Sequence, residues 1–209
     1  MSDPVEADLY YDFRSPYAYL AAHRIETGRF APARPVRWRW RAVSIDVLLN
    51  LQAGRAPLAA YADPLAAPKR RHLVADVGRC ARLYEAPLRR PVPARPDPTL
   101  ALCVATLLEA EDGAGAGFHM AVFRALWEQQ RDIADSAVLA AALPEPAAGL
   151  MERARDPRVR QTLIDNSQTA YDRGVFGVPS FVLGDEVYFG ADRLDLLGAR
   201  LGWDEALAR

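Results

Sequence analysis

The chain has 209 residues, of which 51% are hydrophobic and 25% are charged, and its formal net charge is −1. This size and balance are typical of one soluble domain, with or without an insertion, that buries a core without disulfides or a structural metal. The charge argues against nucleic-acid binding, which needs a basic excess, and no apolar run approaches the roughly 18 residues of a membrane span.

The first 44 residues predict a β-α-β unit. Val5–Phe13 alternates and is rich in aromatic residues, as in a strand, and Pro16–Gly28 has the spacing of an amphipathic helix. The predicted apolar stripe of this helix consists of Tyr17, Leu20, Ala21 and Ile25. Val36–Ser44 alternates apolar and basic residues, which predicts a half-exposed strand. This succession implies a parallel strand pair with a right-handed crossover.

The middle of the chain, residues 45–174, is rich in Ala, Leu, Arg and Glu with helical periodicity. Helices are predicted near residues 45–53, 67–85, 98–111, 115–130, 136–142, 146–153 and 157–174. The segment RRPVPARPDP predicts an extended loop because of its prolines. Cys80 and Cys103 lie in apolar helical patterns, so we expect two buried free thiols. The three histidines share no metal-ligand spacing, so no metal site is expected.

The C-terminal part returns to β structure. Residues 179–190, PSFVLGDEVYFG, are two short apolar runs joined by Gly184 and Asp185, which predicts a hairpin, and residues 191–202 predict a closing helix. Without its helical middle the chain has the order β-α-β … β-β-α. The predicted fold class is therefore α/β, a thioredoxin-like fold with a large all-helical insertion. Residues 1–44 and 175–209 would form the thioredoxin-like domain, and residues 45–174 the insertion.

Ser15 stands between the first strand and the first helix and precedes Pro16. Serine is a preferred N-cap and proline is favoured at the first helical position, so capping alone would explain the pair. In thioredoxin-like redox proteins a CxxC begins the helix here, and the helix N-terminus activates its first cysteine. The tetrapeptide SPYA excludes thiol–disulfide exchange at this place. The helix start still attracts anions, and a serine hydroxyl can donate to the thiolate of an external small-molecule thiol.

Two features near the C-terminus bear on the same site. In thioredoxin-like folds a proline after a cis peptide bond opens the strand that faces the first helix, and Val178-Pro179 is placed for this role. The Val178 backbone would then be available to an extended peptide, although an ordinary proline that opens a strand is the alternative. Asp192, between the hairpin and the last helix, fits an N-cap, a carboxylate that reaches a ligand's ammonium group, or both.

Three segments together resemble the 2-hydroxychromene-2-carboxylate isomerases. They are DFRSPYAYLA, LWEQQRDIADSAVL and FGVPSFVLGDEVYFGADRLDLL, and the resemblance runs from about Asp8 to Gly202. This family belongs to the DsbA-like thioredoxin superfamily and is close to the kappa-class glutathione transferases. The resemblance implies a glutathione-dependent isomerase with glutathione as its cofactor.

The resemblance also implies roles for single residues on the cofactor side. Ser15 matches the serine that contacts the glutathione sulfur. Val178, before the presumed cis-Pro179, matches the residue whose backbone pairs with the cysteinyl part. Ala191 and Asp192 match positions that hold the γ-glutamyl end, the first through its backbone and the second through its charge.

Around the insertion the match is less complete. Lys69 matches a family lysine on the glutathione side, followed by Asp76 at the family's spacing, although a surface lysine on a helix is the alternative. The family often has a Gly-Asn-x-Pro segment before this lysine, whereas here Arg55 stands where the asparagine would be expected. Arg55 is therefore a candidate for substrate binding. Arg95, in the proline-rich segment, is a second candidate because its fork of donors suits a carboxylate.

The implied reaction is a cis–trans type isomerisation in which thiol addition lowers the bond order of a conjugated C=C. A kappa-type glutathione transferase and a non-catalytic thioredoxin-like peptide-binding module stay open as alternatives. A disulfide oxidoreductase is disfavoured because the chain has no CxxC. We expect a cytoplasmic protein with a small-molecule substrate and no nucleic-acid or membrane partner. The superfamily points to a homodimer, which no feature of the sequence establishes.

Overall fold

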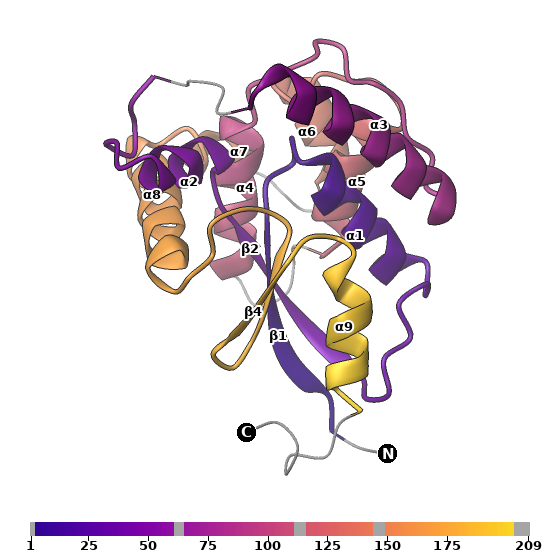
Figure 1. The fold of residues 1–209 in the computed structure, drawn as a ribbon. Coiled ribbons are helices and arrows are strands. Elements are labelled where there is room, and N and C mark those ends of the chain that lie inside the picture. The colour runs from indigo at the N-terminus through magenta and orange to yellow at the C-terminus, as the bar shows by residue number, and fades with distance from the viewer. Residues whose placement is uncertain (1–2, 61–64, 111–115, 144–148, 203–209) are drawn as a thin grey trace.

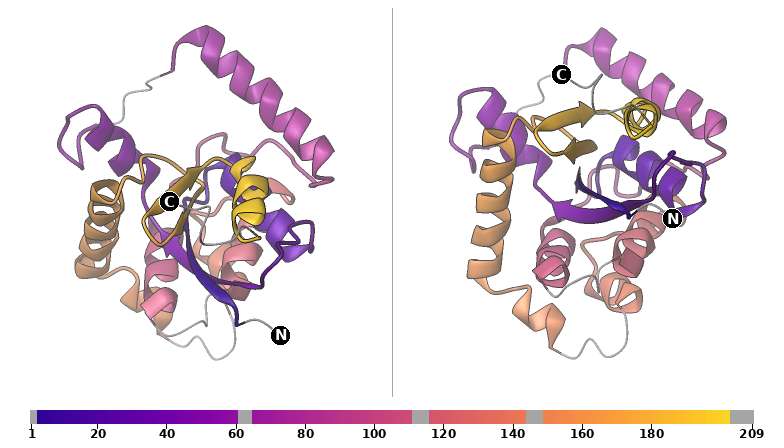
Figure 2. Two further views of the ribbon diagram at one scale, coloured as in Figure 1. Left: turned by 60° about the horizontal axis from the view of Figure 1, so that its bottom comes forward. Right: turned by 90° about the horizontal axis from the view of Figure 1, so that it is seen from below.

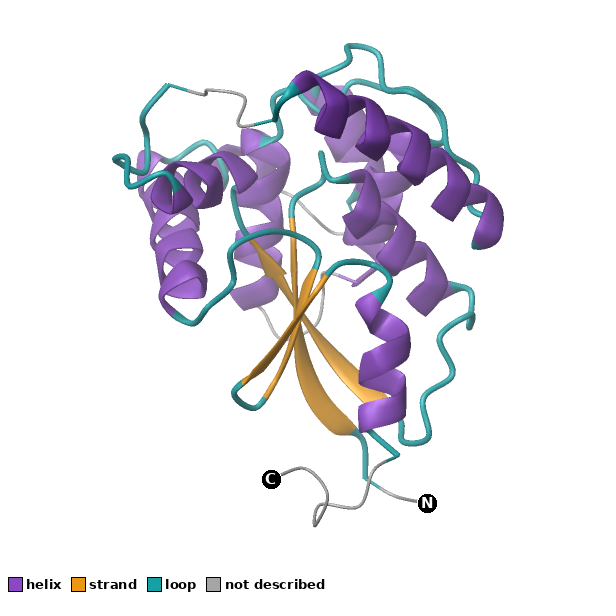
Figure 3. Cartoon of the chain, viewed as in Figure 1, coloured by secondary structure: helices purple, strands orange, loops and turns teal. Residues whose placement is uncertain are grey.

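The computed structural model describes residues 3–60, 65–110, 116–143 and 149–202, and its centre is a sheet with strand order β2-β1-β3-β4 (Figures 1 and 3). Strand β1 (Val5–Tyr11) pairs in parallel with β2 (Val36–Ala42) and antiparallel with β3 (Ser180–Leu183). Strand β4 (Glu186–Phe189) pairs antiparallel with β3. The predicted parallel pair and the predicted hairpin are confirmed.

Helices cover both faces of this sheet (Figures 1 and 2). Helices α1 (Pro16–Glu26) and α9 (Arg193–Arg200) lie on one side, and α2 (Ile45–Gln52) and α8 (Pro157–Asp172) lie on the other. The remaining helices are α3 (Ala67–Leu83), α4 (Thr99–Ala110), α5 (Ala116–Trp127), α6 (Ser136–Ala142) and α7 (Leu150–Arg153). Each helix predicted for the middle of the chain has a counterpart, although the start of the one at 146–153 lies outside the described residues. None of the helices within the described ranges is long and apolar enough to cross a membrane.

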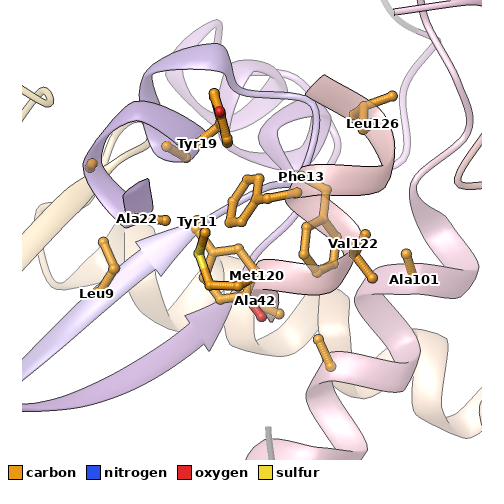
Figure 4. Packing of buried hydrophobic residues seen from close by; sticks show 14 of the residues in the cluster. Leu9, Tyr11, Phe13, Tyr19, Ala22, Ala42, Ala101, Met120, Val122 and Leu126 are labelled. Carbon is orange, nitrogen blue, oxygen red and sulfur yellow. The ribbon is translucent and has the colours of Figure 1, made fainter. Parts of the chain in front are cut away.

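The central strand β1 separates two apolar clusters. Tyr11 belongs to the main core, whereas Tyr10 belongs to a smaller cluster against α2 and α8, because successive side chains of a strand point to opposite faces. Figure 4 shows Tyr11 and Phe13 beside Val122 of α5. The rings of Phe13 and Phe123 meet edge to face with centroids 5.1 Å apart, which contributes about 0.5–1.5 kcal/mol beyond the burial of area. This packing fixes the end of β1, just before Ser15.

Helix α1 is more buried than the sequence predicts. A single apolar stripe was expected, but burial extends around the helix to the residues Ala18, Tyr19, Leu20, Ala21, Ala22 and Arg24. The reason is that α1 contacts α3 and α5 of the helical middle in addition to covering the sheet. A helix enclosed on several sides holds its N-terminus in a fixed place.

A buried carboxylate shapes the turn from β1 into α1, and β1 therefore ends before its predicted end. The Asp12 Oδ1 accepts from the Arg14 amide at 2.8 Å, and its Oδ2 accepts from the Ile45 amide at 2.9 Å. The Arg14 Nη2 lies 3.4 Å from the same Oδ2. The Ser15 amide donates to the Asp12 carbonyl at 3.0 Å. One residue thus fixes both the turn before α1 and the first amide of α2.

We expect Asp12→Ala to lower the free energy of unfolding by roughly 3 kcal/mol, because two backbone amides lose their acceptor and the Arg14 guanidinium loses a carboxylate. The control is Asp156→Ala, which removes the exposed cap of α8, where Oδ1 accepts from the Arg158 amide at 2.8 Å. This control should lower the free energy of unfolding by about 1 kcal/mol. Urea unfolding followed by circular dichroism measures both variants, and equal losses would contradict the role given to Asp12.

Candidate functional site

Ser15 lies at the start of α1 and contacts a segment from the far end of the chain. Its backbone is extended (φ −82°, ψ 113°), and its Oγ accepts from the Ala18 amide at 3.2 Å, so Ser15 is an N-cap. The same hydroxyl donates to the Val178 carbonyl at 3.2 Å. The Tyr17 amide, in the first turn, has no hydrogen-bond partner within the described residues. A hydroxyl and an unpaired amide therefore meet at this helix end.

The peptide bond between Val178 and Pro179 is cis, as the sequence predicts. Val178 is buried, with 6% of its surface exposed, and its N–H has no hydrogen-bond partner in the part of the chain that the structure describes. The Pro179 carbonyl accepts from the Gly190 amide at 2.9 Å, which joins this loop to the end of β4. Because a buried N–H without a partner is costly, the Val178 backbone is suited to an extended peptide ligand.

The residues between β4 and α9 form a tight turn beside α1. Gly190 has φ +111°, and a Cβ there would lie 2.6 Å from the Asp192 Oδ1, so the turn requires glycine. The buried Arg24 guanidinium donates to the Ala191 carbonyl at 3.3 Å and also pairs with Asp195. Arg24 thus ties the turn that carries Ala191 to the helix that begins at the candidate site.

Asp192 stands at the N-cap position of α9, but its side chain bonds no amide of this helix, so of the two roles expected for it the side-chain cap is not formed. The residue already has helical backbone angles (φ −72°, ψ −22°), whereas a capping side chain needs an extended backbone to reach forward. Its carboxylate is 64% exposed and lies 3.7 Å from the Arg193 guanidinium. This negative charge remains accessible to a cationic group of a ligand.

Helix α3 packs beside the start of α1 through a polar cluster. The Tyr17 hydroxyl donates to Asp76 at 2.9 Å, and the Arg79 guanidinium donates to the same carboxylate at 3.0 Å. These hydrogen bonds lower the pKa of Asp76. Burial and the nearby Asp76 charge raise the pKa of Cys80, so this thiol stays protonated at neutral pH. Cys103 is buried as expected, but Cys80 is partly exposed because α3 buries little of its surface.

Two of the predicted residues are not brought to this cluster. Lys69 lies in the first turn of α3 and is exposed. Arg55 follows α2, and its Nη1 donates to the Ala60 carbonyl at 3.1 Å within the same loop. No hydrogen bond or ion pair among the described residues joins either side chain to Ser15 or Val178.

A pocket of about 250 Å³ opens beside Arg14, the residue before Ser15. Its walls are mostly apolar, with Ile45, Leu126 and Trp127 among them. The Asp46 carboxylate lies between two arginines of this pocket. It accepts from Arg14 at 2.9 Å and from Arg95 at 2.8 Å. Arg95 therefore shares a pocket and a carboxylate with Arg14, next to the start of α1.

Sequence reasoning missed Arg14 and Arg24, whose side chains are only 11% and 7% exposed. A signal for Arg24 was present, because it falls seven residues after Tyr17 and so continues the apolar stripe of α1. A charged residue within an apolar stripe is almost never buried unless it is paired, and its partner here is Asp195. Arg14 has no comparable signal, since its neighbours Asp12 and Asp46 are recognised only from the folded chain.

Comparisons with known proteins agree with this architecture. A family model described as the DSBA-like thioredoxin domain matches residues 6–202. A 2-hydroxychromene-2-carboxylate isomerase from Sphingobium xenophagum is 29% identical over 198 residues, which cover 93% of this chain and 96% of the relative. A solved structure of a 2-hydroxychromene-2-carboxylate isomerase superposes with a TM-score of 0.75 at 24% identity, covering 98% of this chain and 97% of the other.

A shorter match links the chain to a second kind of enzyme. Glutathione S-transferase kappa 1 from Homo sapiens is 33% identical over 87 residues, which cover 37% of this chain and 38% of that protein. Together the matches confirm the predicted thioredoxin-like fold and the predicted resemblance to 2-hydroxychromene-2-carboxylate isomerases.

We expect Tyr17→Phe to raise the pKa of Asp76 toward its ordinary value, because the Tyr17 hydrogen bond is the first cause of its depression. NMR titration of the Asp76 carboxyl carbon measures the shift. Tyr188→Phe is the control, since its hydroxyl bonds Glu186 on β4 and leaves Asp76 untouched. An Asp76 pKa that stays low in Tyr17→Phe would show that the contact between α1 and α3 does not persist in solution.

Proposed function

The chain belongs to the DsbA-like thioredoxin family, and on this basis we propose that it is a glutathione-dependent isomerase of the 2-hydroxychromene-2-carboxylate isomerase type. The hydrogen bond from Ser15 to the Val178 carbonyl carries the proposal. It puts a hydroxyl where redox proteins of this fold keep their attacking thiol. The relatives that are named 2-hydroxychromene-2-carboxylate isomerases support the reaction class.

The proposed cofactor is glutathione, and the backbone around Val178 fits it. The buried Val178 N–H lacks a partner among the described residues, and the adjacent carbonyl accepts only from the Ser15 side chain. With Pro179 next in the chain, this donor and acceptor are proposed to pair with the cysteinyl unit, as in strand addition. Ala191 and Asp192 are proposed to hold the γ-glutamyl end, through the backbone and the exposed carboxylate respectively.

Lys69 is proposed to serve the same cofactor from the first turn of α3, where its exposed ammonium group can meet a carboxylate. The resemblance to kappa-class glutathione transferases supports glutathione as the thiol that this chain binds. When bound, glutathione would supply a thiolate that adds to a conjugated C=C and leaves again, so that the bond can rotate in between.

Ser15 and the first turn of α1 are proposed to favour the ionised sulfur. A hydroxyl donor and the positive end of the helix dipole both stabilise a nearby negative charge. A fall of ~1.5 units in the thiol pKa corresponds to ~2 kcal/mol. A hydrogen bond to an ion together with a helix N-terminus supplies about this much.

The Ser15 hydroxyl has a single hydrogen, which points to the Val178 carbonyl in this structure. This oxygen has two lone pairs, so a ligand amide that donates to it weakens the bond from Ser15 without excluding it, which makes it easier for the hydroxyl hydrogen to turn toward a sulfur. Peptide recognition and thiol activation are therefore proposed to be coupled through one carbonyl oxygen. A simple thiol without an amide would be activated less than glutathione.

The pocket beside Arg14 is proposed to receive the substrate, a small unsaturated acid. Its apolar walls suit a conjugated ring or chain, and Arg95 offers a planar fork of donors to a carboxylate. That carboxylate would share Arg95 with Asp46, which now accepts from it at 2.8 Å. Arg55 is proposed as a further substrate contact from the loop after α2, by its place in the sequence.

Two other functions are supported by particular observations. A kappa-type glutathione transferase is supported by the shorter match to glutathione S-transferase kappa 1. Such an enzyme would release the adduct of thiol and substrate, whereas an isomerase eliminates the thiolate from it. A non-catalytic peptide-binding module would use the Val178 backbone alone. A disulfide oxidoreductase is not supported, because the first turn of α1 reads SPYA.

We also propose that the protein is a cytoplasmic homodimer with a small-molecule substrate and no nucleic-acid or membrane partner. Residues 1–44 and 175–209 are proposed as its thioredoxin-like domain, and residues 45–174 as the helical insertion.

We expect Ser15→Ala to fold but to lose most of the thiolate absorbance of bound glutathione at neutral pH, because the donor to the sulfur is gone. Asp135→Ala is the control, since it removes the cap of α6, where Oδ1 accepts from the Ala137 amide at 2.8 Å. It should lose about 1 kcal/mol of stability and keep the absorbance. Unchanged absorbance and turnover in Ser15→Ala would refute the role given to this hydroxyl.

Calorimetric titration with glutathione tests the cofactor directly. We expect saturable binding that Asp192→Ala weakens more than it slows turnover at saturating glutathione, because the carboxylate holds the end of the ligand remote from sulfur. A ligand at 100 times its Kd should also add about 2.7 kcal/mol to stability. An unaltered glutathione affinity in Asp192→Ala would contradict its assignment. Absence of binding and of thermal protection would favour the peptide-binding module.

The fate of the thiol separates the isomerase from the transferase. With an unsaturated pyruvate acid as substrate, we expect catalytic conversion without net loss of free thiol. Stoichiometric thiol consumption, or a stable adduct formed with an electrophilic aryl halide at a comparable rate, would favour the transferase.

A further inference from the structure

A second cavity, of about 180 Å³, lies between the sheet and α8, and none of the residues of the proposed cofactor or substrate side lines it. Its walls combine the C-terminal end of β2 with the last turns of α8. The polar and charged side chains that line it are Tyr10, Arg41, Glu109, Asn166, Thr169 and Arg173. Asn166 and Thr169 are three positions apart on α8 and so share one face of the helix.

Positive charge is in excess at this cavity. The buried carboxylate of Asp8 lies 3.1 Å from the Arg41 Nε and 3.5 Å from the Arg173 Nη1. Arg39 binds the same carboxylate at 2.8 Å and has Glu6 as an additional partner at 3.1 Å. Glu6 reaches Arg39 but neither of the other two arginines, so Arg41 and Arg173 share the single charge of Asp8 and leave positive charge at the cavity.

Both cavity arginines also have donors to spare. Arg41 uses its Nε for Asp8, and its two terminal nitrogens have no partner among the described residues. Arg173 donates from Nη1 to the Tyr10 hydroxyl at 2.9 Å, while its Nη2 has no partner within the same residues. Planar guanidinium groups with open N–H donors are the side chains that best match the oxygens of an oxyanion.

Glu109 supplies an additional polar group. Its Oε1 accepts from the Ala42 amide at 2.8 Å and from the Tyr11 hydroxyl at 3.1 Å. Its Oε2 has no hydrogen-bond partner in the described part of the chain, and the residue lines the cavity. The carboxyl is thus anchored by one oxygen, which leaves the other to a ligand.

We propose that this cavity is a binding site for a small oxyanion of the sulfate or phosphate class, held by Arg41 and Arg173 and completed by Glu109, Asn166 and Thr169. The two arginines come from β2 and from the end of α8, so the anion would join the sheet to this helix. The site is independent of the proposed isomerase function, because it uses none of the residues assigned to glutathione or substrate.

The protonation of Glu109 decides what this residue contributes. Burial raises the pKa of Glu109 to about 8; the hydrogen bonds from the Ala42 amide and the Tyr11 hydroxyl and the charge of Arg41 oppose this rise, and Asp8 adds to it. Tyr11 connects Glu109 to His119, whose Nδ1 lies 2.7 Å from the hydroxyl and whose pKa burial lowers to about 3, so the histidine is neutral. Below pH 8 the Glu109 carboxyl is therefore a neutral donor, and above it a negative charge that repels an anion.

Calorimetric titration of the full chain with sodium sulfate tests the site, because the charge of sulfate is constant between pH 6 and 9 and its general stabilising effect on proteins produces no saturable heat. We expect saturable sulfate binding at pH 7. The affinity should be about tenfold weaker, or weaker still, in Arg41→Gln and in Arg173→Gln. Arg37→Gln is the matched control, because this arginine is on the same strand as Arg41, is 67% exposed and, among the described residues, pairs with Glu6 alone at 3.8 Å.

We expect the sulfate affinity of the unaltered protein to fall from pH 7 to pH 9, and that of Glu109→Gln to stay level. A second titration with inorganic phosphate and with a phosphate monoester separates a free-ion site from one for a phosphorylated metabolite. The proposal would be overturned if sulfate produced no saturable heat, or if the Arg41→Gln, Arg173→Gln double variant produced the same saturable heat as the unaltered protein. Glutathione titration of that double variant should match the unaltered protein, so failure here leaves the isomerase proposal standing.

Discussion

The buried carboxylate of Asp12 connects the two halves of the candidate site. This carboxylate accepts from the backbone amides of Arg14 and of Ile45, the first residue of α2. The backbone carbonyl of Asp12 accepts from the Ser15 amide. Asp46, which bridges the two pocket arginines, stands one residue further along that helix. Asp12 is fully buried, so the amides that it accepts from depend on this side chain and not on bulk water for their partner. The start of α1 and the pocket beside Arg14 therefore share one anchor.

The site separates positive from negative potential over a short distance. The start of α1 presents donors and the positive end of a helix dipole, whereas α3 and the turn before α9 present the carboxylates of Asp76 and Asp192. The start of α1 therefore favours a negative group, and the exposed Asp192 carboxylate favours a positive one. Cys80, which lies beside Asp76, has a raised pKa and stays a neutral thiol.

Periodicity in the sequence predicted nearly every helix and strand, because each element buries a face whose repeat is visible in the chain. The approach of Ser15 to Val178 followed from the predicted thioredoxin-like fold, in which the strand after a cis-proline faces the first helix. What the sequence could not show are partners that meet only on folding. From the sequence Arg14 would be assigned to the surface, because its partners Asp12 and Asp46 come together with it only in the folded chain.

The same limit explains the errors at the ends of elements. Asp192 has the right residue type for a cap, but the helix has already begun at its backbone, so its side chain turns back over Gly190 instead. The burial of α1 exceeded its predicted stripe because the insertion helices add a second layer over it. Such outcomes depend on packing between distant segments, which local patterns do not encode.

The alternation of arginine along β2 has a consequence for how copies of this protein can associate. This strand is the edge of the sheet, and edge strands readily join those of another molecule. Three like charges, on Arg37, Arg39 and Arg41, would face their counterparts if two such edges met. Repulsion between these guanidinium groups therefore disfavours extension of the sheet from the β2 edge of one molecule into the β2 edge of another.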